Sequence, residues 1–598
     1  MRVKSITFVM ALLLFAGSLV GCVAPKEDSR YERLFEQMTI EEKVGQMVQI
    51  RVIETVDEGF LEEASREFVG MPSEETKEMI QECHVGSVVL YSSLDPSFSA
   101  EYTNVLQQWA NETKLGIPLI IAADFETGPG YSTFRGVDPF PQQMGVAATR
   151  STALAEEIAG AIARQSRAMG IHWNYSPVAD VNTNPFNPVI GVRSFGDDPD
   201  LVSSFVAAYV RGYQSNGMIA TAKHYPGHGD TSVDSHLDLP KISQDIETMR
   251  KIHLKPFQAA IDSDVDSVMT AHILIEQTDK SYPATLSPEI LTGLLREEQN
   301  FNGIIVTDGM SMGGIVKHFG IEEASVLAVK AGADVVMATG GYGDQVRTYN
   351  GILEVVKRGE ISEERIDESV RKILEQKQDL GIFENAFVDP GEASACCSSR
   401  GYHELALNAA RRSITLLKNQ GGLLPLSEHV RSVLVTGPVG AEDIAKQLER
   451  KIEKVVVYET SSAEQSNGWS PSARDIRKAK RSARSVDAIL VTTYSSFKPP
   501  IAEGQVRLVE ELKETGKPVV VVSLGLPYDV ASLPPVDAYL ATYSLNRWQS
   551  PRTGYGSVPL VYCQAIAGVV CGDFNPVGRL PVQIPNTGFD RGSGLSYK

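Results

Sequence analysis

The chain has 598 residues, of which 42% are apolar and 22% charged, a composition typical of a globular protein. This length allows several hydrophobic cores, about four at roughly 150 residues each, although a single α/β barrel can be much larger. The net charge of -19 and the lack of a long basic run disfavour a nucleic-acid partner.

The first 22 residues are predicted to be a targeting segment. They begin with two basic residues and continue with an apolar run at 6–20, which is too short for a membrane span. The ending at residues 19–22 resembles the bacterial lipoprotein signal, which implies that Cys22 becomes a lipidated N-terminus and anchors the protein to the membrane. An ordinary cleaved signal peptide is the alternative. Both predict a mature protein outside the cytoplasm, with residues 23–30 as a polar tether.

Short apolar runs alternate with segments of helical periodicity over the first half of the mature chain. Eight such runs predict buried parallel strands, which indicates an α/β fold with an N-terminal (β/α)8 barrel of the TIM type at residues 31–385. Two further helices, near 344–357 and 362–379, are expected to complete the barrel. The predicted strands are Val44–Ile50, Val85–Leu90, Ile117–Asp124, Ile171–Asp180, Ile219–Tyr225, Ser267–Ile273, Gly303–Asp308 and Ala333–Thr339.

A second domain is predicted at residues 401–598, after a linker of small residues at 386–400. The alternation of strand and helix patterns indicates an open parallel sheet in an α/β/α sandwich. The domain shows no cluster of titratable residues, so its expected role is structural, or to cover the barrel mouth. Its predicted strands are 432–436, 455–458, 488–493, 519–524 and 538–544, and its helices 441–452, 471–484 and 505–514.

Polar residues fall at the ends of the predicted barrel strands. Asp124, Asp180 and Asp308 are the last residues of three of them, His272 is next to last in a fourth, and Lys223–His224 lie just before the last residue of a fifth. Chemistry in such barrels takes place at the C-terminal ends of the strands. The sequence therefore predicts one polar site at the barrel mouth.

The loop after the fifth strand, residues 224–236, holds three of the ten histidines of the chain and two aspartates. Its Gly and Pro content is typical of loops that display catalytic groups. One interpretation is glycoside hydrolysis, with Asp308 facing the anomeric carbon and a proton donor facing the leaving oxygen. His236 suits the donor because Asp234, two residues away, would fix its tautomer and favour its protonated form.

Two other interpretations of this loop stay open. His224, His228 and His236, together with Asp230 and Asp234, are residue types that bind zinc and would support metal-assisted hydrolysis. Such crowded ligands on a Gly-rich loop lack the rigid spacing that a helix provides. The third interpretation is a structural loop whose histidines bond to the backbone.

The segment Lys223–Gly229 with Asp234–His236 closely resembles the signature loop of glycoside hydrolase family 3 β-N-acetylglucosaminidases of the NagZ type. The likeness extends over residues 31–598. It implies a carbohydrate substrate, a terminal β-linked N-acetylglucosamine, and no metal or organic cofactor. The other similar segments are Asn174–Asn182, Asn187–Gly191, Arg193–Gly196, Pro283–Ser287, Val306–Met312, Ala409–Asn419 and Gly578–Pro581.

The resemblance implies a role for each site residue. Asp308 would be the nucleophile that forms a covalent glycosyl-enzyme, His236 the acid/base and Asp234 its orienting partner. The substrate would be bound by Asp124, at the hydroxyls of the non-reducing end, and by Arg193, Lys223 and His224, at the hydroxyls and the acetamido group. The alternatives are a helix cap for Asp124, a structural ion pair for Arg193 and a solvated loop end for Lys223.

One segment departs from the family pattern, which is Asp-x-Glu-Gly-Gly followed by an Arg that reaches the sugar. This chain has Thr127 in place of the first Gly, and Ser132 stands where the Arg is expected. Arg135 would substitute if the loop is longer. We therefore expect the grip on the sugar to differ.

The natural substrate is left open between peptidoglycan fragments, chito-oligosaccharides and glycan conjugates. Three other functions stay open as well: a phosphorylase, in which phosphate replaces water, a family 3 glycosidase of another specificity, and a non-catalytic carbohydrate-binding lipoprotein of the envelope.

Overall fold

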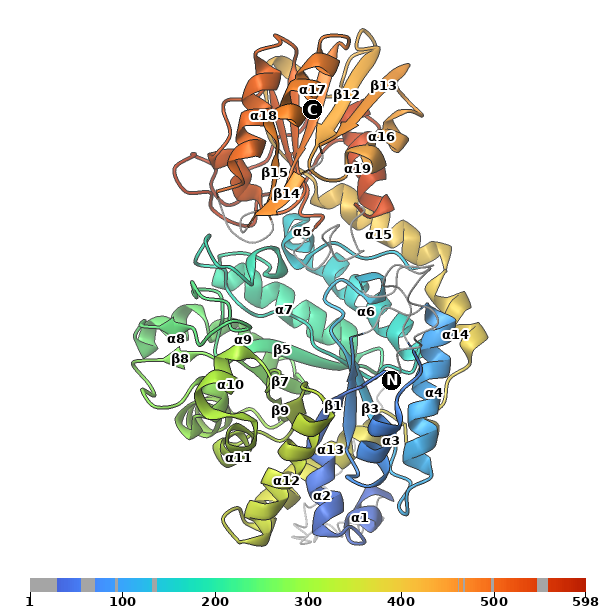
Figure 1. The fold of residues 1–598 in the computed structure, drawn as a ribbon, viewed down its shortest axis with the longest axis vertical. Helices are drawn as coiled ribbons and strands as arrows, with labels where there is room; N and C mark the ends of the chain where they lie inside the picture. The colour runs from blue at the N-terminus through green and yellow to red at the C-terminus, as the bar shows by residue number, and fades with distance from the viewer. Residues whose placement is uncertain are drawn as a thin grey trace, which may run out of the picture.

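The computed structural model describes residues 30–54, 70–91, 95–131, 137–460, 462–465, 468–495, 500–545 and 558–597. The predicted signal peptide with Cys22, and the tether up to residue 29, lie outside these ranges. Ser132 and Arg135 also lie outside the described residues, so the structure does not test whether Arg135 substitutes for the missing Arg. Two domains are stacked along the long axis of the molecule (Figure 1).

The N-terminal domain is a barrel of eight parallel strands: β1 (Val48–Arg51), β2 (Ser87–Leu90), β3 (Ile120–Ala123), β4 (Trp173–Asn174), β5 (Ile219–Tyr225), β7 (Ser267–Thr270), β9 (Ile304–Val306) and β10 (Val336–Ala338). The strand order is β10-β1-β2-β3-β4-β5-β7-β9. A parallel bridge between Val306 and Val335 connects the two ends of this order, so the sheet is nearly closed. The predicted (β/α)8 barrel is confirmed.

Helices surround the barrel (Figure 1). Many begin at a Ser, Thr or Asp whose side-chain oxygen accepts a hydrogen bond from a backbone N–H of the first turn, and this satisfies a donor that the helix leaves unpaired. Thr39, Ser151 and Asp198 are examples. The helices are α1 (Arg30–Phe35), α2 (Ile40–Gln46), α3 (Glu74–Gln81), α4 (Pro96–Asn111), α5 (Gln143–Ala148), α6 (Thr152–Ala168), α7 (Pro199–Gln214), α8 (Ile246–Ile252), α9 (Lys255–Ile261), the π-helix η5 (Glu289–Glu298), α10 (Gly313–Phe319), α11 (Ile321–Ala331), α12 (Tyr342–Lys357) and α13 (Glu363–Asp379). Short elements complete this part: η2 (Pro129–Tyr131), η3 (Gly191–Arg193), η4 (Ala284–Leu286), β6 (Lys241–Ile242) and β8 (Leu274–Ile275).

Most predicted strands differ from the structure by one to three residues at an end, and two differ by four or more. The first predicted strand began at Val44, but a capping box at Thr39 starts helix α2, which runs to Gln46. The fourth was predicted to reach Asp180, but β4 ends at Asn174. Pro177 has no N–H to donate to a neighbouring strand, so the regular ladder cannot continue through it.

The C-terminal domain holds a six-stranded sheet in the order β11-β18-β17-β16-β12-β13. The parallel sheet that the sequence predicts is present in five strands, but the edge strand β11 pairs antiparallel with β18 and was missed. The strands are β11 (Thr415–Asn419), β12 (Ser432–Gly437), β13 (Lys454–Glu459), β16 (Ala488–Thr493), β17 (Val519–Ser523) and β18 (Ala538–Ala541), with a hairpin of β14 (Ser462–Gln465) and β15 (Gly468–Pro471). The other elements are α16 (Ala441–Leu448), α17 (Ala473–Ala483), α18 (Glu503–Lys513), α19 (Leu560–Cys571), η6 (Gln420–Gly422) and η7 (Pro527–Ala531).

The connection between the domains is helical. The predicted linker contains α14 (Pro390–Cys397), and α15 (Arg400–Ser413) then runs along the boundary, next to α5 of the barrel (Figure 1). Direct bonds also join the domains: the backbone N–H of Arg579 donates to the Ala148 carbonyl at 2.8 Å. In the part of the chain that the structure describes, no helix has the length and apolar character needed to cross a membrane.

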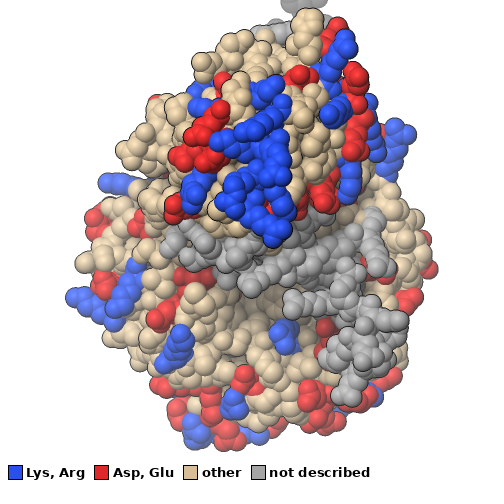
Figure 2. Space-filling model, turned by 45° about the horizontal axis from the view of Figure 1, so that its top comes forward, with Lys and Arg blue, Asp and Glu red and all other residues tan. Residues whose placement is uncertain are grey.

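Charge is distributed unevenly over the surface. Although the chain carries a net charge of -19, Figure 2 shows Lys and Arg side chains gathered on one face of the C-terminal domain. Acidic side chains are spread over much of the remaining visible surface (Figure 2).

Candidate active site

The barrel brings the predicted polar residues to one end. Asp124 follows β3 directly, Lys223 and His224 are among the last three residues of β5, and Asp308 lies two residues after β9. These strands are parallel, so their C-terminal ends face the same side. Hydrogen bonds and charge interactions connect the side chains at these strand ends with those of the loop at residues 224–236.

His236 and Asp234 form a hydrogen-bonded pair. The Nδ1 atom of His236 lies 2.7 Å from Oδ1 of Asp234, and the same oxygen accepts the backbone N–H of His236 at 3.0 Å. Asp234 is buried, whereas the His236 side chain is 41% exposed. A buried carboxylate therefore holds an accessible imidazole, the arrangement that the sequence predicted for an acid/base.

Asp308 is a half-buried carboxylate among histidines. Burial acts to raise its pKa, but electrostatic interactions with His272, His224 and His236 outweigh this effect and lower the pKa to about 2. The backbone N–H of Gly309 also donates to Asp308 Oδ1 at 2.7 Å. Asp308 is thus ionised at neutral pH, as a nucleophile must be.

His272 is an additional site residue that follows strand β7. Its ring is completely buried and lies between Thr285 Oγ1, at 2.9 Å from Nδ1, and the Gly309 carbonyl, at 3.0 Å from Nε2. Burial lowers the pKa of its imidazole below the usual value. His272 therefore holds the backbone next to Asp308 in place. The sequence showed this histidine at a strand end but did not indicate its role.

A buried ionic network joins strands β3 and β5 to the loop after β4. The Nζ atom of Lys223 lies 2.6 Å from Asp124 Oδ1 and 2.8 Å from Glu126 Oε1. The guanidinium of Arg193 donates to both oxygens of Glu126, at 2.6 Å from Nη2 and 3.0 Å from Nε. Burial acts to raise the pKa of Glu126, but Arg193 and Lys223 hold it far below its usual value.

This network places Arg193 and Lys223 beside a carboxylate that the sequence did not assign to the site. Glu126 had been noted only as part of the departing segment. Arg193 is in an ion pair, as one alternative interpretation expected, whereas Lys223 is almost completely buried and not a solvated loop end. Asp124 is paired with Lys223 and 39% exposed, so it is the member of the network most open to a ligand.

Asp180 organises the first part of the loop at residues 224–236, called the His loop below. Its Oδ2 atom lies 2.8 Å from His224 Nδ1, and its Oδ1 atom accepts the backbone N–H of His228 at 2.6 Å. Burial acts to raise the pKa of Asp180, but His224 and His228 lower it below its usual value. His224, predicted to bind substrate, is thereby fixed in orientation and mostly buried.

The rest of the loop is held between two neighbouring segments. Gly229 packs so closely on the Val181 carbonyl that an added Cβ would lie 1.8 Å from the oxygen, so only Gly fits. On the other side, the backbone N–H of Gly313, at the start of α10, donates to the carbonyl of His236 at 3.2 Å. The loop that carries His236 is therefore held on both sides.

The three loop histidines have different partners. His228 lies between Ser235 Oγ, at 2.9 Å, and Thr231 Oγ1, at 2.7 Å, while His224 faces Asp180 and His236 faces Asp234. Within the described ranges, no three His, Cys, Asp or Glu side chains are grouped so that they could hold a metal ion.

Tyr91 is a residue of the mouth that the sequence analysis missed. It directly follows β2 and is 48% exposed. Burial of its hydroxyl, together with the negative charges of Asp124 and Asp308, raises its pKa. Because the carboxylates of Asp124 and Asp308 both act on its hydroxyl, Tyr91 lies near the predicted nucleophile and near a predicted sugar-binding residue. An aromatic residue just after an apolar strand was the only available signal.

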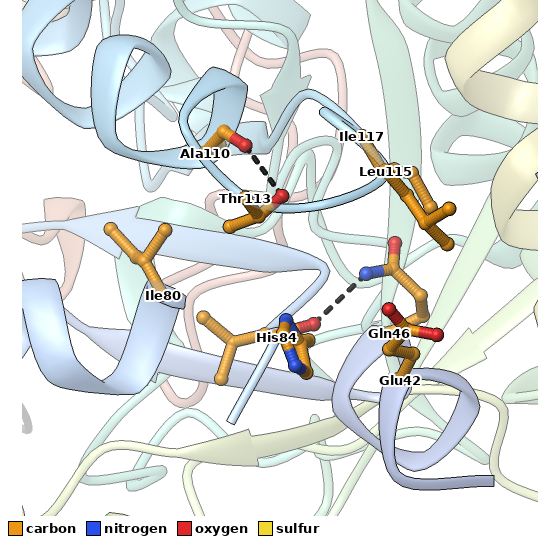
Figure 3. Close-up of a pocket in the computed structure, with 9 residues that line it drawn as sticks. Glu42, Gln46, Ile80, His84, Ala110, Thr113, Leu115 and Ile117 are labelled. Carbon is orange, nitrogen blue, oxygen red and sulfur yellow. Dashed lines mark hydrogen bonds between the residues drawn. The ribbon is translucent and has the colours of Figure 1, made fainter. Parts of the chain in front are cut away.

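A separate pocket lies at the opposite end of the barrel strands. Gln46, Val85 and Ile117 line it, and each precedes one of the strands β1, β2 and β3 (Figure 3). Its volume of about 20 Å³ is enough for roughly one water molecule. The N-terminal end of such barrels serves stability rather than chemistry.

Comparisons with known proteins agree with this architecture. The chain is 29% identical to Beta-hexosaminidase A of Pseudoalteromonas piscicida, over 85% of this chain and 91% of that protein. It is 28% identical to a Beta-N-acetylglucosaminidase/beta-glucosidase of Cellulomonas fimi, over 77% and 84% respectively. A glycoside hydrolase family 3 beta-N-acetylglucosaminidase from Paenibacillus sp. str. FPU-7 has a similar structure, with a TM-score of 0.78, 30% identity, and coverage of 92% of this chain and 99% of that one.

Both domains match family models. Residues 39–376 match the glycosyl hydrolase family 3 N-terminal domain, and residues 414–594 match the glycosyl hydrolase family 3 C-terminal domain. The first match alone covers more than half of the chain. The two-domain fold and these matches together establish that the chain is a glycoside hydrolase of family 3.

Proposed function

We propose that this glycosidase is a retaining, exo-acting β-N-acetylglucosaminidase. The observation that carries the proposal is the 2.7 Å bond between His236 and buried Asp234, next to the histidine-surrounded carboxylate of Asp308. The name of the Paenibacillus relative, a beta-N-acetylglucosaminidase, supports the same sugar, and that of the P. piscicida relative, a beta-hexosaminidase, supports an amino sugar.

In the first step Asp308 attacks the anomeric carbon of a terminal β-linked sugar. The carbon–oxygen bond to the aglycone breaks, and protonated His236 donates its proton to the departing oxygen. Asp234 stabilises the imidazolium before the proton transfer. It also binds Nδ1 of His236, so that Nε2 is the nitrogen that faces the departing oxygen. The products are a covalent glycosyl-enzyme on Asp308 and the free aglycone alcohol.

In the second step water attacks the same carbon from the side that the aglycone left. Neutral His236 takes a proton from the water, and the bond to Asp308 breaks. The sugar is released with its β configuration retained, and both residues return to their starting states.

The buried network is proposed to form the sugar-recognition side of the site. Asp124 would accept hydrogen bonds from the sugar hydroxyls, while Lys223, Arg193 and His224 contact the hydroxyls and the acetamido group. Glu126 would hold Lys223 and Arg193 in position, because it is bonded to both.

The proposed setting is the outer face of the cytoplasmic membrane. The lipoprotein-like ending at Cys22 supports a lipid anchor there, and peptidoglycan fragments or chito-oligosaccharides would be the substrates. Globomycin treatment and labelling with an alkyne fatty acid test the anchor. The label should disappear in the Cys22→Ser variant, and a label that persists in this variant would contradict the lipid anchor.

A panel of p-nitrophenyl β-glycosides tests the proposed sugar. The N-acetylglucosaminide should be cleaved with kcat/KM well above that of the glucoside and xyloside. A preference for the glucoside would favour the second candidate, a β-glucosidase, which the double name of the C. fimi relative makes specific. If none of the three glycosides is cleaved, a non-catalytic carbohydrate-binding protein is favoured.

Two additions to this assay separate the remaining alternatives. Formation of sugar 1-phosphate in phosphate buffer would identify a phosphorylase. Loss of activity with EDTA and its restoration by zinc would support the metal interpretation. We expect hydrolysis in phosphate buffer and full activity in EDTA.

A further inference from the structure

Helix α17 presents a row of positive charges on the surface of the C-terminal domain. Arg474, Arg477, Lys478 and Arg481 are exposed, and Arg484, the C-cap residue, is exposed as well. The four arginines follow one another at separations of three or four residues, and Lys478 lies four residues after Arg474 and three before Arg481, so the five share one face of the helix. Figure 2 shows Lys and Arg side chains gathered on one face of the C-terminal domain, the domain that contains α17.

These cations are not neutralised by the domain. Among the residues that the structure describes, none of the five forms an ion pair with a carboxylate, whereas Lys480 on the same helix is paired with Glu511 and Glu514. Lys478 lies over the ring of Tyr458, with Nζ at 5.6 Å from the centroid, which leaves its charge in place. An acidic chain thus keeps one row of positive charge open to a ligand.

The row is straight and rigid. An α-helix rises about 1.5 Å per residue, so the charges from Arg474 to Arg484 extend over about 15 Å with a spacing of about 5 Å. Ile476, Ala479 and Ala483 on the opposite face are buried in the domain core, which fixes the helix. A linear ligand with regularly repeated negative charges matches this arrangement.

The chemistry of the row favours phosphate. Guanidinium groups bind phosphate oxygens with two parallel hydrogen bonds, and four of the five residues are arginines. Membrane insertion is disfavoured, because no large apolar residue among the exposed ones of the described chain belongs to α17. Double-stranded DNA carries a charge about every 1.7 Å and would be repelled by the acidic remainder of the chain.

We propose that the α17 row binds a phosphodiester-linked polyol or sugar polymer. Such a polymer is flexible, carries one charge per repeat unit, and can follow the helix without bringing dense negative charge against the rest of the surface. The contact would keep the enzyme on an anionic glycan matrix while the barrel acts on glycosides. It does not require the lipid anchor or the proposed sugar specificity.

Binding of the full-length protein to poly(glycerol phosphate) tests the proposal. Isothermal titration at low and at 200 mM salt should show binding that weakens with salt, since exposed charges are screened over about 8–10 Å. The double variant Arg477→Glu with Arg481→Glu should bind about tenfold or more weakly. Cleavage of the preferred p-nitrophenyl glycoside should be unchanged in this variant.

A matched variant controls for net charge. Lys114→Glu with Arg400→Glu makes the same change in net charge at two exposed positions outside the α17 row, and should bind like the unchanged protein. Equal weakening in both variants would overturn the proposal, as would no binding of the polymer. Tighter binding to duplex DNA or to anionic phospholipid vesicles than to the polymer would also overturn it.

Discussion

The side-chain amide nitrogen of Asn182, in the barrel, donates to the hydroxyl oxygen of Tyr528, in the C-terminal domain, at 3.2 Å. The residues after Asn182 are bonded to the His loop: Thr183 Oγ1 donates to Asp230 at 2.9 Å, and Asn184 donates to the Thr231 carbonyl at 3.0 Å. The C-terminal domain is therefore connected through one short segment to the loop that carries the proposed acid/base.

Tyr528→Phe removes only the hydroxyl of this connection. One buried hydrogen bond contributes about 1 kcal/mol, so we expect kcat to fall about fivefold on glycosides whose leaving group needs a proton. Dinitrophenyl glycosides, which leave without protonation, should be cleaved at the normal rate. Tyr543→Phe is the control, since its hydroxyl bonds to Thr415 inside the same domain. Equal losses on both substrate types would exclude a positioning role for Tyr528.

Asp308→Gly removes the proposed nucleophile. Turnover should be abolished on every glycoside, because neither leaving-group activation nor His236 can replace the attacking carboxylate. Addition of azide to this variant with an activated β-glycoside should yield the α-glycosyl azide, detected by mass spectrometry and NMR. Substantial hydrolysis by the variant would assign the nucleophile to another residue.

His236→Ala removes the proposed proton donor. General acid catalysis contributes about 10²–10⁴-fold, so activity on chito-oligosaccharides should fall by that factor. Activity on dinitrophenyl glycosides should fall much less in the glycosylation step. Asp234→Asn should show the same dependence on the leaving group with a smaller loss. A plot of log kcat/KM against leaving-group pKa measures both, and an unchanged slope argues against acid catalysis.

Glu126→Gln removes the carboxylate that Arg193 and Lys223 share. Breaking a buried ion pair costs about 3–5 kcal/mol, so the free energy of unfolding should fall by about that amount. KM for the preferred glycoside should rise, because both cations lose their position. Glu156→Gln, which breaks an exposed pair with Arg211, should cost about 0–1 kcal/mol. Urea unfolding and steady-state kinetics measure both effects; equal costs for the two variants would refute a central role of Glu126.

Asp529 is a buried carboxyl of the C-terminal domain whose hydrogen bonds, among the described residues, come from the hydroxyl groups of Ser495, Thr493 and Ser523. Burial raises its pKa to about 6. Its pKa is therefore higher in the folded chain than the value of about 3.9 in the unfolded chain, so the folded state binds more protons between these values. The stability that this group contributes is complete below pH 4 and is lost as the pH rises through 6.

Asp529→Asn should remove this pH dependence. The free energy of unfolding of the unchanged protein should fall by up to about 3 kcal/mol between pH 4 and pH 7 from this group, and the variant should lack that decrease. Denaturant titrations at half-unit pH intervals measure the difference. If the difference between the two proteins is the same at pH 4 and pH 7, Asp529 does not titrate as inferred.

Much of the barrel was predictable because its determinants are local. A parallel strand that is buried on both faces is a continuous apolar run, so the run Ile219–Tyr225 predicted β5 with its correct bounds. The pairing of His236 with Asp234 was also predictable, because two residues of one loop are close regardless of the rest of the fold. The antiparallel edge strand β11 was not, since a short run beside a helix carries no sign of its pairing direction.

Sequence alone thus determined the layer architecture, the family and the residues proposed for the two chemical steps, because apolar periodicity and short motifs are properties of neighbouring residues. The tertiary structure decided which polar side chains from distant parts of the sequence come into contact. Glu126 bonds to Arg193, 67 positions along the chain, and Tyr528 reaches Asn182 across 346 positions. Such contacts depend on how the strands are ordered and how the domains are placed, and no local pattern specifies either.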